Sequence, residues 1–126
     1  MTMKPSGVAT DPDPGLAVQS RQVGTALVVA LRGELDLDSV PLLNEHLDAA
    51  LGGPGSRVVV VDCERLGFCD STGLNALLAA RLRAEETGSV FRLAALPRST
   101  TRMFDITGAS KVFELYPDLD RALAAR

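Results

Sequence analysis

Four consecutive valines, Val58 to Val61, constrain the fold of this chain more than any other feature of its sequence. An unbroken β-branched run of this length is typical of a parallel strand that is covered on both faces. A glycine- and proline-rich segment, residues 52–55, separates the run from the apolar stripe before it, and such a segment ends a helix. The valine run therefore predicts an α/β domain built around a mostly parallel sheet.

Strand and helix patterns alternate along the rest of the chain. Alternating apolar residues from Leu16 and an apolar run over 26–31 predict a hairpin that turns at Gly24. Further strands are expected at 90–96 and 112–115. Four helices are expected, and three of them show an apolar stripe: Val40, Leu43, Leu47, Ala50 and Leu51; Leu74, Leu77, Leu78 and Leu82; Leu119, Ala122 and Leu123. The remaining helix, at about 99–107, carries Met103, Phe104 and Ile106. The expected order is β-β-α-β-α-β-α-β-α, with about five strands in a mixed, mostly parallel sheet and helices packed against it.

Length and charge limit the classes of function. The 126 residues suffice for one domain, which we expect at 16–126 after a disordered leader at 1–15 rich in Pro, Gly and Asp. A net charge of −3 gives no reason to expect nucleic acid as a partner. No apolar run approaches the length that crosses a membrane, and no signal peptide follows Met1. We therefore expect a cytoplasmic protein, with Cys63 and Cys69 as reduced, buried thiols.

Two polar segments are expected as loops at the same edge of the sheet, because the carboxyl ends of parallel strands meet there. One is 33–38, with Glu34, Asp36 and Asp38, and the other runs from Cys63 to Asp70 and continues into Ser71, Thr72 and Gly73. Each segment taken alone has an ordinary explanation. Residues 70–73 suit the start of a helix, and residues 34–36 suit a solvated turn.

Three motifs together resemble a known family. GELD at 33–36, DCERLGFCDSTGL at 62–74 and MFDITGASKVF at 103–113 resemble the STAS-domain anti-sigma-factor antagonists. The resemblance covers the chain from about Leu16 to its end, and Cys69 departs from it, because a larger apolar residue is common at that position.

The resemblance implies a partner-switching function. In this family the serine after the aspartate is phosphorylated, so the phosphorylation site is expected at Ser71. The implied partners are an anti-sigma factor that is also a serine kinase, and a serine phosphatase that acts on the phosphorylated form. The residues that match the family's partner-binding motifs are Gly33, Glu34, Asp36, Asp70, Thr72 and Gly73.

The physical chemistry of phosphate supports such a switch. A phosphate adds about −1.5 to −2 charges at pH 7, and a helix N-terminus tolerates negative charge. The fold should accept the modification at Ser71. Its effect should fall on a partner, because the expected edge is already acidic at Glu34, Asp36 and Asp70.

No pattern in the sequence predicts an enzyme, a cofactor or a metal. His46 is the only histidine, zinc-ligand spacing is missing, and no glycine-rich nucleotide motif occurs. Two alternatives remain open: a STAS scaffold or stress-complex subunit without a direct sigma-factor pathway, and a phosphoacceptor domain that uses Asp62. The second usually needs clustered acids and a nearby lysine, and the only lysines are Lys4 and Lys111.

Overall fold

A five-stranded sheet in the order β2-β3-β4-β5-β6 organises the computed structural model, which describes residues 15–53 and 57–125. The elements in chain order are β2 (Leu16–Val23), β3 (Ala26–Leu35), α1 (Val40–Leu51), β4 (Val58–Cys69), α2 (Ser71–Thr87), β5 (Val90–Ala94), α3 (Arg98–Thr107), the 3-10 turn η1 (Ala109–Lys111), β6 (Glu114–Tyr116) and α4 (Leu119–Ala124). The expected order of strands and helices is confirmed. The expected leader lies outside the described residues except for Gly15.

The sheet is mixed, as predicted. β2 pairs with β3 in an antiparallel hairpin, and the three remaining strand pairs are parallel. Gly24 turns the hairpin with a φ of +61°, a conformation that costs glycine little. The valine run lies in β4, the middle strand, where Val59, Val60 and Val61 are fully buried.

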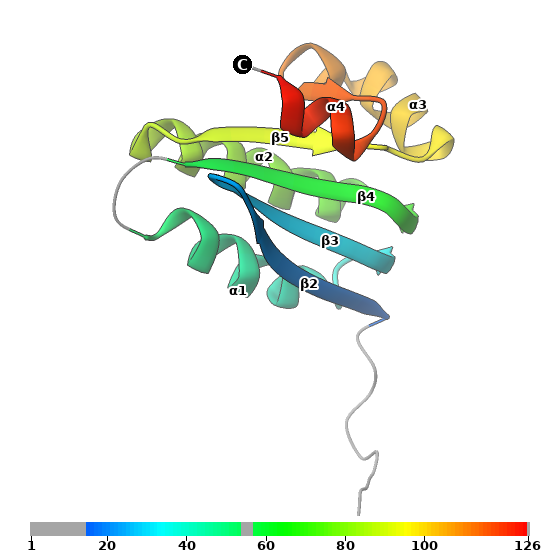
Figure 1. Ribbon diagram of the computed structural model, residues 1–126. Coiled ribbons are helices and arrows are strands. Elements are labelled where there is room, and N and C mark those ends of the chain that lie inside the picture. The colour runs from blue at the N-terminus through cyan, green and yellow to red at the C-terminus, as the bar shows by residue number, and fades with distance from the viewer. Residues whose placement is uncertain (1–14, 54–56, 126) are drawn as a thin grey trace, which may run out of the picture.

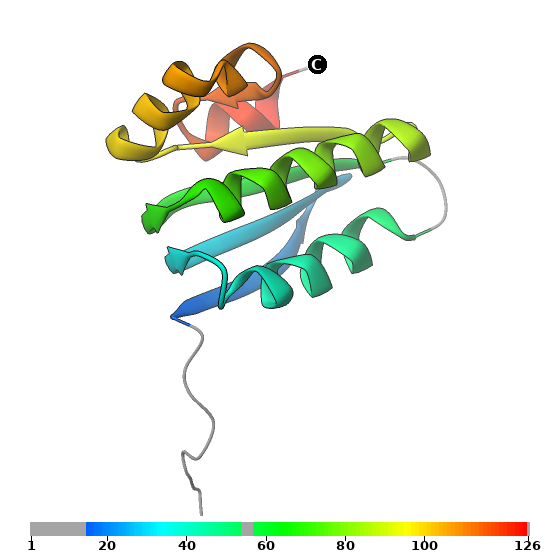
Figure 2. The same cartoon turned by 180° about the vertical axis from the view of Figure 1, so that it is seen from behind.

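The two faces of the sheet are covered unequally. Helices α1, α2 and α3 lie over one face (Figure 2), where they enclose the main core with buried leucines from α1 and α2 and with Phe104 of α3. The short helix α4 lies on the opposite face, toward β4, β5 and β6 (Figure 1). It buries only a small cluster of Val60, Ala94 and Ala122 there. The face formed by β2 and β3 on that side therefore has no helix above it among the described residues.

Strands β3 and β4 run further than predicted. The expected loops at 33–38 and 63–70 were placed too early, because β3 continues to Leu35 and β4 to Cys69. Irregular register between Ala30 and Arg32, and again between Gly33 and Glu34, lets the two strands stay paired through these polar segments. Two other strands are shorter than predicted. β5 ends at Ala94 rather than at residue 96, and β6 begins at Glu114 rather than Val112.

Leu82, which was expected in the apolar stripe of α2, is 55% exposed instead. In α3, Phe104 is buried and Ile106 is 79% exposed. In α2 the buried positions beyond Leu77 are alanines, Ala80 and Ala84, whose small side chains allow a helix to approach a sheet closely. The predicted stripe is therefore correct at Leu74 and Leu77 and wrong at Leu82, where alanines continue the buried face instead.

Arg92 of β5 is a buried charge that the sequence did not reveal. Its Nη1 donates to the carbonyl oxygens of Ala122 at 2.9 Å and Ala125 at 3.2 Å, at the end of α4. Its Nε donates to Glu114 Oε1 at 3.2 Å. A cation suits the C-terminus of a helix, so Arg92 fixes α4 against the sheet.

Both cysteines are buried free thiols, as expected. Burial raises the pKa of the Cys63 thiol strongly, and burial together with the nearby Asp70 raises the pKa of Cys69 to about 12. Since only the thiolate is nucleophilic, neither should react in the folded protein.

We expect no labelling of the two cysteines by iodoacetamide at pH 8 in native buffer and two labels per chain in denaturant, measured by intact mass. Rapid native labelling of Cys69 would contradict this placement.

Candidate functional site

The ends of β3 and β4 meet the start of α2 at one edge of the sheet. Glu34 pairs with Phe68, and Leu35 pairs with Cys69 across the two parallel strands. The backbone N–H of Asp70 donates to the carbonyl oxygen of Leu35 at 3.2 Å. The structure thus joins the two motifs, 35 residues apart in the chain, that the sequence placed at the same edge.

Asp70 performs the capping, and this leaves Ser71 free. Asp70 is the N-cap of α2, and its Oδ1 accepts a hydrogen bond from the backbone N–H of Gly73 at 3.0 Å. Ser71 is the first helical residue and is exposed. Its hydroxyl bonds to none of the residues that the structure describes. Helix capping therefore explains Asp70 but does not explain a serine at position 71.

Thr72 and Gly73 differ from Ser71 in their exposure. Thr72 is half-buried, whereas Gly73 is buried against Leu35 and Cys69. A Cβ at Gly73 would lie 2.7 Å from Leu35 Cγ and 2.9 Å from Cys69 Sγ. Gly73 thus lets the first turn of α2 close onto the end of the sheet, and its contribution to the edge comes from its small size.

The Gly73→Ala variant is expected to be less stable by about 1 kcal/mol or more. Overpacking costs about 1–3 kcal/mol, which exceeds the gain of up to about 1 kcal/mol from replacing glycine in a helix. Gly67→Ala is a matched control, because its Cβ would meet only the carbonyl oxygen of Gly33, at 3.6 Å. Urea unfolding of both variants measures the difference. Equal stability of Gly73→Ala and the parent would contradict the packing of this turn.

Asp36 is committed to the local structure of the β3–α1 connection. Its Oδ1 accepts hydrogen bonds from the backbone N–H groups of Asp38 and Ser39, at 3.1 and 3.2 Å. The buried Ser39 hydroxyl donates to the carbonyl oxygen of Glu34 at 2.8 Å. Asp36 therefore holds the loop that leads into α1, and Asp38 beside it is exposed.

Gly33 and Glu34 contribute differently to this edge of the sheet. Gly33 has a φ of +111°, and a Cβ there would collide with the carbonyl oxygen of Gly15. The backbone N–H of Glu34 donates to that same oxygen at 2.8 Å, while its side chain is exposed. Of the predicted partner-binding residues, Glu34 thus offers a free side chain, whereas Gly33 shapes the backbone.

Two exposed apolar side chains lie at this edge that the sequence did not predict there. Leu37, after β3, is 70% exposed, and Phe68, near the end of β4, is 48% exposed. Exposed large apolar groups beside polar ones are typical of contact surfaces between proteins. The signal was present in the sequence as apolar residues within otherwise polar segments.

The described residues hold neither a membrane-spanning helix nor a cluster of metal-binding side chains. No helix within 15–53 and 57–125 is long and apolar enough to cross a membrane. In the same ranges no three His, Cys, Asp or Glu side chains lie close enough together to hold a metal ion.

Comparison with known proteins identifies the family. The family model described as "Mlab, STAS domain" matches residues 18–117. The chain therefore belongs to the STAS-domain family, and the predicted fold and the resemblance are confirmed.

Two similar proteins are named as anti-sigma factor antagonists. The anti-sigma-B factor antagonist of Bacillus subtilis is 29% identical over 99 residues, which are 78% of this chain and 88% of the relative. An anti-sigma factor antagonist from Mycobacterium paratuberculosis has a crystal structure that is 28% identical. It aligns with a TM-score of 0.79 over 89% of this chain and 94% of that one.

A third similarity concerns the fold alone. The anti-sigma factor antagonist SpoIIAA in its unphosphorylated form is 23% identical, with a TM-score of 0.72 over 85% of this chain and 93% of that one. A structure of Bacillus SpoIIAA in the phosphorylated form aligns with a TM-score of 0.68. The same fold therefore exists with and without a phosphate in that protein.

Proposed function

We propose that this protein is an anti-sigma-factor antagonist that binds an anti-sigma factor kinase while Ser71 is unmodified and releases it when Ser71 is phosphorylated. A serine phosphatase acting on the phosphorylated form would complete the cycle. The observation that carries the proposal is that Asp70 and Ser71 have different roles at the start of α2. Asp70 caps the helix, so the exposed Ser71 hydroxyl is available to another protein.

The surroundings of Ser71 suit a protein partner. Leu37 and Phe68 offer exposed apolar area at the same edge, and Glu34 and Asp38 offer exposed carboxylates. Such a combination of apolar anchors and charges supports both affinity and specificity. The relatives' shared name, anti-sigma factor antagonist, supports the identity of the partner.

A phosphate at Ser71 would act on the interface more than on the fold. The N-terminus of α2 carries the positive end of the helix dipole, which favours an added negative charge. The exposed carboxylates nearby would make the combined surface more acidic. A partner matched to a neutral hydroxyl and a few carboxylates would then meet a dianion, so the complex should weaken.

A displacement assay tests the proposal. Purified candidate anti-sigma factors, each bound to a fluorescently labelled sigma factor, are titrated with the unmodified protein. We expect saturable release of sigma factor with one cognate anti-sigma factor. Binding without release would favour the scaffold or stress-complex alternative. A phosphorylated form that is labile to hydroxylamine would favour an acyl phosphate at Asp62, because phosphoserine resists that reagent.

A further inference from the structure

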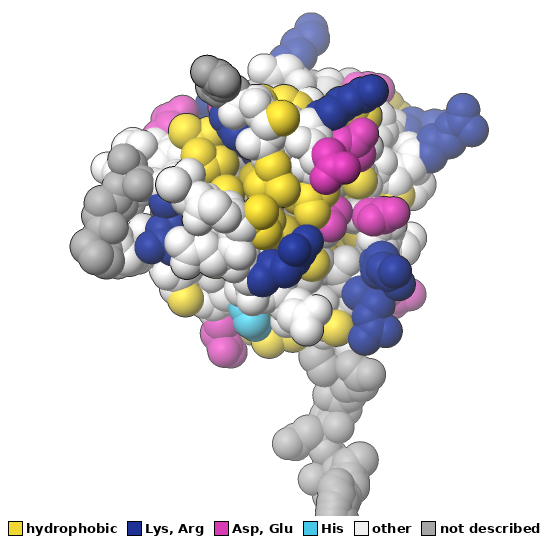
Figure 3. Space-filling view, viewed as in Figure 1, with side chains coloured by type: hydrophobic (Ala, Val, Ile, Leu, Met, Phe, Trp, Pro, Cys, Tyr) yellow, Lys and Arg dark blue, Asp and Glu magenta, His cyan; other side chains and the backbone are white. Residues whose placement is uncertain are grey.

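A groove of about 420 Å³ crosses the uncovered face of the sheet, on the side of β2, β3 and β4 away from α1 and α2. Its size is in the range of small binding sites in proteins. Two residues with small side chains, Ala17 and Ala30, line it. Figure 3 shows this face, where charged side chains surround a central apolar area.

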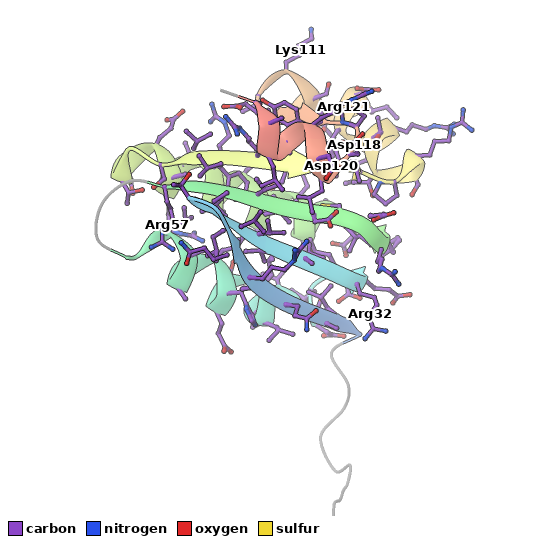
Figure 4. All side chains as sticks on the ribbon, viewed as in Figure 1. Arg32, Arg57, Lys111, Asp118, Asp120 and Arg121 are labelled. Carbon is purple, nitrogen blue, oxygen red and sulfur yellow. The ribbon has the colours of Figure 1, made fainter. Side chains whose placement is uncertain are left out.

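Three arginines from three adjacent strands line the groove: Arg21 of β2, Arg32 of β3 and Arg65 of β4. Leu31 and Leu66 face the helix-covered core, so their neighbours Arg32 and Arg65 project to the opposite face. Figure 4 shows Arg32 near the end of the sheet where β2 begins.

Arg32 and Arg65 are direct neighbours in the parallel pairing of β3 and β4. Adjacent strands lie about 4.8 Å apart, and like charges directly opposite each other are destabilising. Neither guanidinium, nor that of Arg21, has a salt bridge or hydrogen bond to any residue that the structure describes. The fold therefore brings together positive charges that have no direct ion pair among the described residues.

Two carboxylates also line the groove, Asp62 and Glu64. Asp62 Oδ1 accepts a hydrogen bond from the backbone N–H of Glu64 at 3.2 Å, so one of its oxygens is engaged locally. Neither carboxylate pairs with an arginine of the groove within 4 Å among the described residues. The three guanidiniums thus outnumber the carboxylates and keep their donors available.

We propose that this groove is a second docking surface, which takes an acidic segment of a protein partner and holds its carboxylates with Arg32 and Arg65. Guanidinium groups bind carboxylates with paired, charge-assisted hydrogen bonds. The small side chains of Ala17 and Ala30 leave room in the groove for the extended backbone of the partner's segment. The surface lies on the other face of the sheet from α2, so it does not depend on Ser71.

The test uses a fluorescein-labelled decapeptide of alternating glutamate and threonine, titrated by fluorescence anisotropy with the full chain. We expect saturable binding that weakens with added salt, because the contacts are partly exposed. Arg32→Ser combined with Arg65→Ser should weaken it about tenfold. Arg98→Ser combined with Arg102→Ser is the matched control, because both of those arginines are exposed on α3 outside the groove. The control should stay within about twofold of the parent.

Several outcomes would overturn the proposal. Equal losses in the two double variants would show diffuse attraction rather than a site, and so would binding that never saturates. Tighter, Arg32- and Arg65-dependent binding to vesicles with anionic lipid would assign the surface to a membrane instead. Ser71→Asp should leave peptide binding unchanged, and a loss there would move the contact to the edge at α2. Failure of the sigma-factor displacement assay leaves this result untouched, so the two proposals fail separately.

Discussion

Replacing Leu74 with alanine is expected to lower the free energy of unfolding by about 2–5 kcal/mol. Leu74 lies in the first turn of α2, is 5% exposed, and belongs to the main core. Truncating it removes apolar contacts and leaves a cavity that a turn fixed by Asp70 and by the close packing of Gly73 can fill only in part. Urea unfolding followed by circular dichroism measures the change.

Leu82→Ala is the matched control for this prediction. Leu82 lies on the same helix and loses the same atoms, but it is 55% exposed. Its substitution should change the free energy of unfolding by no more than about 0.5 kcal/mol. A similar loss in both variants would contradict the burial of Leu74 and the exposure of Leu82.

Replacing Ser71 with aspartate is expected to weaken binding of the anti-sigma factor by about tenfold or more, while leaving the fold intact. A negative charge at the first position of α2 is favourable to the helix, whereas at the interface it places an unmatched charge where the partner fits a neutral hydroxyl, and burying an unpaired charge is costly. Ser71→Ala should bind normally and resist phosphorylation, so it should remain permanently active. Isothermal titration of each variant with the purified partner gives the affinities, and thermal melting confirms folding.

Ala79→Asp provides a charge control on the same helix. Ala79 is exposed two turns after Ser71, about 12 Å along the axis. The affinity of the Ala79→Asp variant for the partner should stay within about twofold of the parent's, because the added charge lies away from the proposed edge. If it weakens binding as much as Ser71→Asp does, net charge rather than the position at Ser71 would be responsible. The mimic is expected to be partial, because a carboxylate has less charge than a phosphate.

The architecture was largely predictable because its signals are local. Val58 to Val61 marked the central parallel strand, and glycines marked the ends of α1, α2 and α3. Strand-like and helix-like hydrophobic patterns alternate along the chain and predict the order of elements. Because the connections between them are short, neighbouring elements must pack side by side, which predicts the topology of the sheet. The capped start of α2 was also predictable, since Asp and Ser are the residue types that begin helices.

The details that the sequence concealed depend on contacts between distant residues. The extension of β3 through Glu34 and of β4 through Phe68 requires irregular pairing between the two strands, which neither segment signals alone. The inward face of α2 depends on Ala80 and Ala84, which resemble exposed helix formers until a sheet packs against them. Arg92 looks like a surface cation until α4 folds over it.

The candidate site was predictable in its position but less so in the roles of its residues. The sequence placed Glu34, Asp36, Asp70 and Ser71 at one edge, and the structure brings these segments together. It could not separate the exposed Glu34 from Asp36, whose carboxylate holds the turn before α1. That distinction requires the hydrogen bonds of the folded loop.

Mass spectrometry of the protein after incubation with ATP and the anti-sigma factor kinase proposed as its partner tests whether Ser71 is the switch. We expect one phosphate, located on Ser71, and an anti-sigma factor that no longer co-elutes with the modified protein in size-exclusion chromatography. Ser71→Ala should remain unmodified and stay in the complex. Phosphate found mainly on Thr72 or elsewhere, or a Ser71-phosphorylated protein that binds its partner as tightly as the parent, would contradict the proposed switch at Ser71.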